Sequence, residues 1–193
     1  MAQLFKTIRL AMVLILILIG MAMCSEHRAT AGEISIGTSF IDGSHSEGSK
    51  TRCMNTGFGV DLGYEVKPLD YELHKLLNVS LNTGVLATYS NFETAYRATS
   101  RSPESDMKRE IGLTIGVTAK PTVTVGIVSV YPIFGFGYDY NEPDDAFGFG
   151  VTTGFGADIE ITDDVKLSVS RREFNRFDRT FYRYNTATVI FEF

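Results

Sequence analysis

Three side chains of the types that hydrolases use stand side by side in the stretch Gly43-Ser-His-Ser-Glu-Gly48. A nucleophile, a base and an acid act together only when they converge in space, whereas neighbours along an extended chain point to opposite faces. The surrounding Gly and Ser residues are typical of a turn or loop. We therefore interpret the stretch around His45 as a loop and His74 as an inward polar residue, and we predict no catalytic residue.

Metal and redox chemistry have equally little support in the sequence. Asp144 and Asp145 offer oxygen atoms of the kind that calcium prefers, but no spaced Asp/Asn/Gly loop surrounds them. A solvated acidic turn is the simpler interpretation. Cys53 is the one cysteine left if the N-terminal 31 residues are removed, which excludes a disulfide within the remaining chain. We predict no metal site and no cofactor.

A group of arginines near the C-terminus has aromatic residues between its members, and consists of Arg171, Arg172, Arg176, Arg179 and Arg183. A guanidinium group binds phosphate as a planar fork. Arg171 and Arg183 share one strand parity, so we expect them close together on one face, where like charges repel unless an anion lies between them. The pattern indicates a phosphate contact made by Arg171, Arg183, Arg176 and Arg179; an ordinary charged rim is the alternative.

The N-terminus has the organisation of a secretory signal. Lys6 and Arg9 precede the apolar run Leu10–Met23, which is shorter than the roughly 20 residues of a membrane-spanning helix. Ala29-Thr-Ala31 predicts cleavage after Ala31, leaving a single domain over 32–193; cleavage after Ala22 is the alternative. A lipidated Cys24 is disfavoured by the preceding methionine.

The net charge excludes one class of partner. The full chain carries a formal charge of −5, and residues 1–31 hold three basic residues against one acidic residue, so the mature chain is two charges more negative. Nucleic-acid binding needs a basic surface. We therefore predict no nucleic-acid partner.

The remaining sequence alternates between apolar and small or polar residues, as strands do. In the last segment, Phe193, Phe191, Val189 and Ala187 share one face and the chain ends on the aromatic residue. A change of parity within the fifth segment predicts a β-bulge near Ile127–Ser129. The eight segments are 33–40, 57–66, 72–89, 110–119, 122–140, 147–161, 165–173 and 182–193.

The connections alternate in length. Longer loops are expected at 41–56, 90–109, 141–146 and 174–181, and short turns at 67–70, 120–122 and 162–164. An even number of strands with short turns on one side is the pattern of bacterial outer-membrane barrels, and it places both termini on the periplasmic side. The sequence therefore predicts an all-β fold, an eight-stranded antiparallel up-and-down transmembrane β-barrel.

A lipocalin is also an eight-stranded barrel, but its apolar face points inward. Here the row of small residues suits a narrow interior, and aromatic residues lie towards the ends of the apolar rows. This favours the membrane version. Its lumen is then a polar network of Asp61, Glu65, Asp158, Glu160, Lys166 and Arg172. In the hairpin centred on Asp163, Glu160 falls opposite Lys166, and we expect an ion pair between them.

The C-terminal stretch Gly154-Phe-Gly-Ala-Asp-Ile-Glu-Ile-Thr-Asp-Asp-Val-Lys-Leu-Ser-Val-Ser-Arg-Arg-Glu-Phe174 resembles the last strands of the opacity-like porin family, whose fold is the small barrel of the outer membrane protein A transmembrane domain. The resemblance covers strands six to eight in sequence and the rest only in architecture. It implies that Phe191 and Phe193 serve as the signal that the barrel assembly machinery reads. Similar barrels that deacylate lipid A carry His-x-Ser on the penultimate strand; Ser168-Val-Ser170 lacks the histidine.

The resemblance implies a non-enzymatic outer-membrane protein acting in envelope integrity or surface interaction. Its partners would be outer-membrane lipid, lipopolysaccharide at the arginine group, and a surface or host partner at loops 41–56 and 90–109. Two alternatives stay open: a narrow pore, and a lipid A-modifying enzyme.

Overall fold

The computed structural model describes residues 32–47, 50–97, 108–142, 146–177 and 180–193, with side chains left out at 43–56, 94–108, 146 and 180. All of them belong to one compact unit, Ala31–Phe193. The predicted leader 1–31, Asp144, Asp145, Arg179 and the side chains of His45 and Cys53 lie outside the described part. Among the described residues, no helix is long and apolar enough to cross a membrane.

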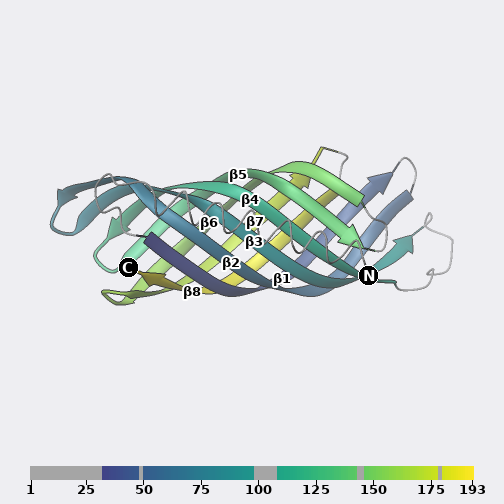
Figure 1. The fold of residues 1–193 in the computed structure, drawn as a ribbon, viewed down its shortest axis with the longest axis horizontal. Coiled ribbons are helices and arrows are strands. Elements are labelled where there is room, and N and C mark those ends of the chain that lie inside the picture. Colours follow the sequence, from purple (N-terminus) through teal and green to yellow (C-terminus); the bar gives the residue numbers. More distant parts are fainter. Residues whose placement is uncertain (1–31, 48–49, 98–107, 143–145, 178–179) are drawn as a thin grey trace. The chain divides into compact units, whose positions relative to one another are not determined.

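Eight strands follow one another around a closed ring, and each pairs antiparallel with its neighbours in sequence (Figure 1). The ring closes where β1 pairs with β8. The predicted fold class is thus confirmed. The strands are β1 (Gly32–Glu47), β2 (Lys50–His74), β3 (Leu77–Arg97), β4 (Lys108–Val125), β5 (Val128–Glu142), β6 (Ala146–Thr162), β7 (Val165–Arg176) and β8 (Thr180–Glu192).

The strands are strongly staggered. A line drawn across them from Glu33 follows the residue partners through β2 to β8 and returns to β1 at Gly43, ten residues further along. This stagger is the shear that sets the tilt and diameter of a barrel. A row of residue partners is therefore inclined to the barrel axis. With each successive strand, the row moves away from the end that holds Gly32 and Phe193 and towards the opposite end.

Side chains alternate between the lumen and the outer face. In β5 the burial pattern switches at almost every residue, and the outward residues Phe134, Phe136 and Tyr138 are each more than half exposed. Phe191 and Phe193 also face outward, at 45% and 69% exposure. The apolar row is thus the outer one, as predicted for a membrane barrel and opposite to a lipocalin.

Two predicted turns lie elsewhere. The segment 67–70 is part of β2, which continues to His74 with a register shift between Val66 and Leu69. The segment 120–122 is part of β4, and the turn comes after Val125. Prolines caused both errors, because a proline in a strand resembles a turn in sequence.

The β-bulge predicted near Ile127–Ser129 is also wrong. The parity changes there because β4 ends and β5 begins, with Gly126 at φ 61° in the tight turn between them. A glycine adopts this left-handed conformation without strain. The change of parity therefore marks the hairpin turn between β4 and β5.

The segments predicted as long loops are mostly strand. Residues 41–56 belong to β1 and β2 except for 48–49, and β3 and β4 extend through 90–97 and 108–109. Backbone pairing continues here, as at Glu47 and Lys50, after the apolar alternation has ended. Alternation reveals only the part of a strand that faces an apolar environment, so it underestimates strand length.

The hydrogen-bonded ladder between β4 and β5 is interrupted at one place. The pairing of β4 with β5 runs to Ala119 and Phe134, stops, and resumes at Val123 and Val130. The register places Pro121 opposite Pro132 in the gap. Two residues paired in an antiparallel ladder exchange two N–H···O bonds, and proline has no N–H. We call this interruption the proline joint.

Replacing both prolines by valine should restore these bonds. We expect Pro121→Val/Pro132→Val to raise the free energy of unfolding by about 1 kcal/mol, since each bond contributes about 1 kcal/mol and the loss of proline rigidity offsets part of it. Urea unfolding in lipid vesicles measures this. Pro68→Val, at the register shift of β2, is the control and should give no gain. An unchanged midpoint for the double variant would contradict this account of the joint.

Candidate functional site: the polar lumen and the outer rim

The lumen near Gly32 and Phe193 holds a group of four alternating charges. Lys166 lies 2.8 Å from a Glu33 oxygen and 2.7 Å from a Glu192 oxygen. Lys67 approaches the same two carboxylates at 3.0 and 2.6 Å. Glu33 and Lys166 are only 3% and 7% exposed. Such buried charges are stable only when they are paired, and here two cations face two acids.

The predicted ion pair between Glu160 and Lys166 is therefore wrong in its acid. The two residues are opposite in register, as expected. However, Lys166 contacts Glu192 on the neighbouring strand β8 and Glu33 on β1, the strand after β8 in the closed ring. The alternation within the hairpin of β6 and β7 does not show these contacts, because they depend on how β8 and β1 close the ring.

The next group of polar side chains lies on the lumen side of the wall, beside the proline joint. Lys120 pairs with Glu65 and lies over the Tyr131 ring, 5.2 Å from its centroid. The Tyr131 hydroxyl is 2.6 Å from Asp158 and 2.8 Å from Ser168. The predicted lumen residues Glu65 and Asp158 are thus buried and satisfied, although Lys120 and Tyr131 were not predicted.

A third group surrounds Arg172, which was predicted to face the lumen and is 5% exposed. Its guanidinium donates to Asp61 and, at 2.7 Å, to Thr88. Thr88 in turn donates to Asp61 at 2.5 Å. The guanidinium carbon also lies 4.8 Å from the centroid of the Tyr184 ring, a cation–π distance. The arginine therefore bridges several strands.

Arg176 belongs to a fourth group and not to the outer surface, which corrects its predicted role in phosphate binding. Its guanidinium lies 3.2 Å from Asp139, to which Thr114 and Asn141 also donate, at 3.0 and 3.1 Å. Asn141 also donates to the Tyr182 hydroxyl. Arg176 has the inward parity of Arg172. The prediction was wrong because it relied on the closeness of Arg176 to Arg171 in the sequence.

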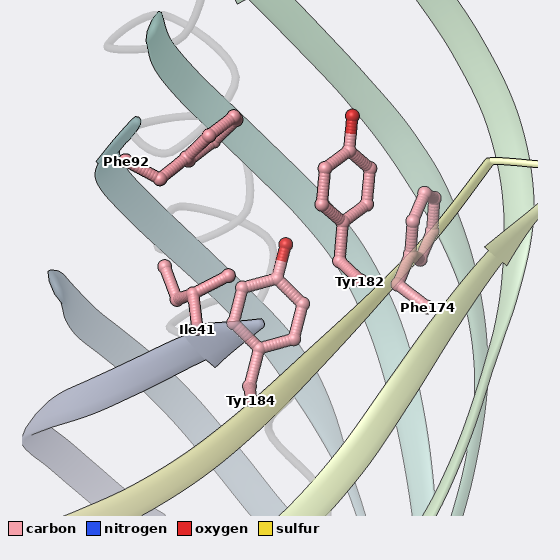
Figure 2. Packing of buried hydrophobic residues seen from close by; sticks show 5 residues of the cluster. All are labelled: Ile41, Phe92, Phe174, Tyr182 and Tyr184. Carbon is pink, nitrogen blue, oxygen red and sulfur yellow. The ribbon is translucent and has the colours of Figure 1, made fainter. Parts of the chain in front are cut away.

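An apolar cluster lies within the barrel beside these upper groups, and its side chains converge from β1, β3, β7 and β8 (Figure 2). Tyr182 and Phe92 are 6.0 Å apart between ring centroids, and Tyr182 and Tyr184 are 6.4 Å apart. The members are Ile41, Phe92, Phe174, Tyr182 and Tyr184, all at most 3% exposed. They were not predicted: Ile41, Phe92, Phe174 and Tyr182 lie at or beyond the ends of the expected strands, and Tyr184 lies two residues inside one.

The described side chains leave little free space beside the upper groups of the lumen. A cavity of about 20 Å³ beside Thr88, Thr114 and Arg172 has room for about one water molecule. Over the described residues, no group of three His, Cys, Asp or Glu side chains could hold a metal ion. His74 is exposed on β2 rather than inside the lumen. The charged groups are thus arranged to stabilise a closed interior.

On the outer face, the rim opposite Phe193 is marked by polar pairs. Arg183 lies 2.9 Å from Glu173 and 3.5 Å from Asp42, and Arg109 donates to Asn91 at 2.9 Å. The expected anion beside Arg183 is therefore supplied by the chain's own carboxylates, which corrects the idea that Arg171 and Arg183 need a phosphate between them. Arg171 faces outward as predicted, but no described acid pairs with it.

The pair of Asp61 and Arg172 should be strongly coupled. We expect Asp61→Asn and Arg172→Gln each to lower the free energy of unfolding by about 3 kcal/mol, and the double variant to lose about 2 kcal/mol less than the sum, because each single variant leaves one buried charge unpaired. Urea unfolding in lipid vesicles measures the cycle. The exposed pair Glu173 and Arg183 is the control, with coupling below about 1 kcal/mol. Equal coupling energies in the two double-mutant cycles would show that burial is not the cause of the strong coupling.

Comparison with known proteins agrees with this geometry. Neisserial surface protein A has a TM-score of 0.55 and 15% identity over 84% of this chain and 99% of that chain. Ail, the attachment invasion locus protein of Yersinia pestis, has a TM-score of 0.48 and 18% identity over 86% and 100%; Ail has also been solved with the heparin analogue sucrose octasulfate. No curated protein matches the sequence. At these identities the first likeness shows the fold alone.

The family model described as "Outer membrane protein beta-barrel domain" matches residues 11–193. The match covers the whole ring of strands, and the resemblance to small outer-membrane barrels is confirmed. Membership places the protein in the bacterial outer membrane. The chain belongs to the outer membrane protein β-barrel domain family.

Proposed function

We propose that the chain is a non-enzymatic surface protein of the outer membrane that acts through the strand ends opposite Phe193. One observation carries this proposal: β1–β2 and β3–β4 pair well beyond the apolar band. On the outer face, Phe40, Phe58 and Tyr89 are followed by Asp42, Asn91 and Glu93, while the pairing continues to Glu47 and Arg97. Paired strands outside the band are rigid platforms on which to present side chains.

The orientation is part of the proposal. The three connections at the Phe193 end are the two-residue turns at 75–76, 126–127 and 163–164, and Gly32 and Phe193 pair at the same end. Short turns are periplasmic in bacterial barrels. Both termini would then be periplasmic, which suits an exported chain cleaved after Ala31, and the extended hairpins would face the exterior.

The filled lumen supports this function over a pore. The four polar groups and the apolar cluster lie one after another along the described part of the lumen. An eight-stranded barrel has little interior space beyond its own side chains. We expect planar bilayers containing the pure protein to show no stable ion conductance. Lipid A from cells with and without the protein should be identical by mass spectrometry, and a change in acyl chains would favour the enzyme.

The extended hairpins provide the direct test. Replacing 43–55 or 93–108 by a short Gly-Ser linker should lower the adherence of intact cells to epithelial monolayers at least fivefold, because the contact surface is removed and the barrel is kept. Adherent cells are counted at equal amounts of heat-modifiable protein. A Gly-Ser replacement of Asp163-Asp164 at the opposite end is the control. Adherence that survives both hairpin replacements would contradict the proposal.

The terminal aromatic residue should act in assembly more than in stability. The Phe193 backbone exchanges hydrogen bonds of 2.9 and 3.0 Å with Gly32, and its ring faces outward. Phe193→Ala keeps these bonds, so we expect several-fold less folded protein in the outer membrane but an unchanged urea midpoint after refolding in vitro. Phe177→Ala, another exposed outward ring, is the control. A normal yield in cells would contradict the assembly signal.

A further inference from the structure

An apolar groove of about 660 Å³ crosses the outer face of β4, β5, β6 and β7. Two rows of outward residues form its sides, and the residue partners define both rows. One row is Pro121, Pro132, Phe155 and Arg171; the other is Val123, Val130, Ala157 and Val169. Gly156 and Ser170 lie between the rows; Gly156 has no side chain and Ser170 has inward parity, so the floor there is largely backbone. The groove thus begins at the proline joint and ends at Arg171.

Arg171 is unusual among the outward cations. Arg183 has two carboxylates beside it and Arg109 has Asn91, whereas the strand partners of Arg171 are Phe155 and Asn185. The structure pairs it with no acid among the described residues. Val169, the previous outward residue on the same strand, is 63% exposed on the apolar band. An arginine on the lipid-facing surface costs up to a few kcal/mol, and a phosphate ligand would offset that cost.

The direction of the groove fits a lipid. Rows across the strands rise with strand number towards the polar rim, because the ring is staggered by ten residues. Arg171 is therefore at the end of the groove nearest the rim, and Pro121 and Val123 on β4 form the end deepest in the apolar band. The groove spans three strand spacings, about 14 Å. A phosphate at the rim would have its acyl chain running down into the membrane.

We propose that this groove binds one acyl chain of lipopolysaccharide, with a lipid A phosphate held by Arg171. The choice between phosphorylated lipids rests on the orientation given under the proposed function: the rim beside Arg171 then lies in the outer leaflet, where lipopolysaccharide is the phosphorylated lipid. The apolar walls select an acyl chain, and the unpaired guanidinium selects an anionic headgroup as a planar fork. The site is independent of any partner of the hairpins.

Titration of the pure, full barrel in neutral detergent micelles tests the site. Native mass spectrometry counts bound lipid for three probes: purified lipopolysaccharide, the same lipid after enzymatic removal of its phosphates, and phosphatidylglycerol. We expect Arg171→Gln to weaken lipopolysaccharide binding about tenfold, which corresponds to about 1.4 kcal/mol. The dephosphorylated lipid should bind the unaltered protein as weakly as lipopolysaccharide binds Arg171→Gln. Arg171→Lys should recover part of the affinity.

A second variant tests the walls separately. Ala157→Phe fills the middle of the groove and should weaken all three lipids at least tenfold. Ala87→Phe, outward on β3, and Arg109→Gln, outside the groove at the rim, are the matched controls and should bind as the unaltered protein does. Heat-modifiability confirms that each variant is folded.

Two results would overturn the proposal. The first is binding by Arg171→Gln within twofold of the control Arg109→Gln, which leaves Arg171 no role. The second is phosphatidylglycerol binding as tightly as lipopolysaccharide, which rejects the chosen lipid. Neither result changes the adherence expected of the hairpins, so a failure here is distinct from a failure of the surface function.

Discussion

The structure depends on one constraint: backbone N–H and C=O groups inside a membrane find no water, so each must be satisfied by another strand. A sheet meets this condition only by closing on itself, and here the last pairs join β1 to β8 through Gly32 and Phe193. The stagger of ten residues that allows closure also narrows the lumen. The proline joint departs from this condition, since Pro121 and Pro132 have no N–H groups. The ladder between β4 and β5 therefore lacks the two hydrogen bonds that this residue pair would otherwise form.

The narrow lumen then determines the side chains that fill it. Once side chains from opposite walls touch, a charge that points inward is buried, and a buried charge must have a partner. Arg172 satisfies this condition with Asp61 and Thr88, and Lys166 does so with Glu33 and Glu192. These contacts join strands that are far apart in sequence. The same pairs that stabilise the ring therefore also occupy its interior.

The sequence predicted the features that alternation reports, and missed those that depend on the third dimension. The strand number, the outer apolar face and the inward positions of Asp61, Glu65, Asp158, Lys166 and Arg172 follow from parity alone. Asp139 and Glu33 could have been found in the same way, because both have inward parity within expected strands. The partners of Lys166 could not, since they lie on β8 and β1 and depend on the register in which these strands close the ring. Turns were misplaced where prolines lie inside β2 and β4, because proline is rare in strands.

The rim arginines show why charge alone is a poor guide to a binding site. Arg171, Arg176 and Arg183 look equivalent in sequence, but Arg176 is inside the barrel with Asp139, and Arg183 is neutralised by Glu173 and Asp42. Arg171 has no acidic partner among the described residues, and it lies at the end of the apolar groove. A ligand gains most where the chain has left an interaction unmade. The proposed lipid site therefore rests on Arg171 and not on the most basic stretch of the sequence.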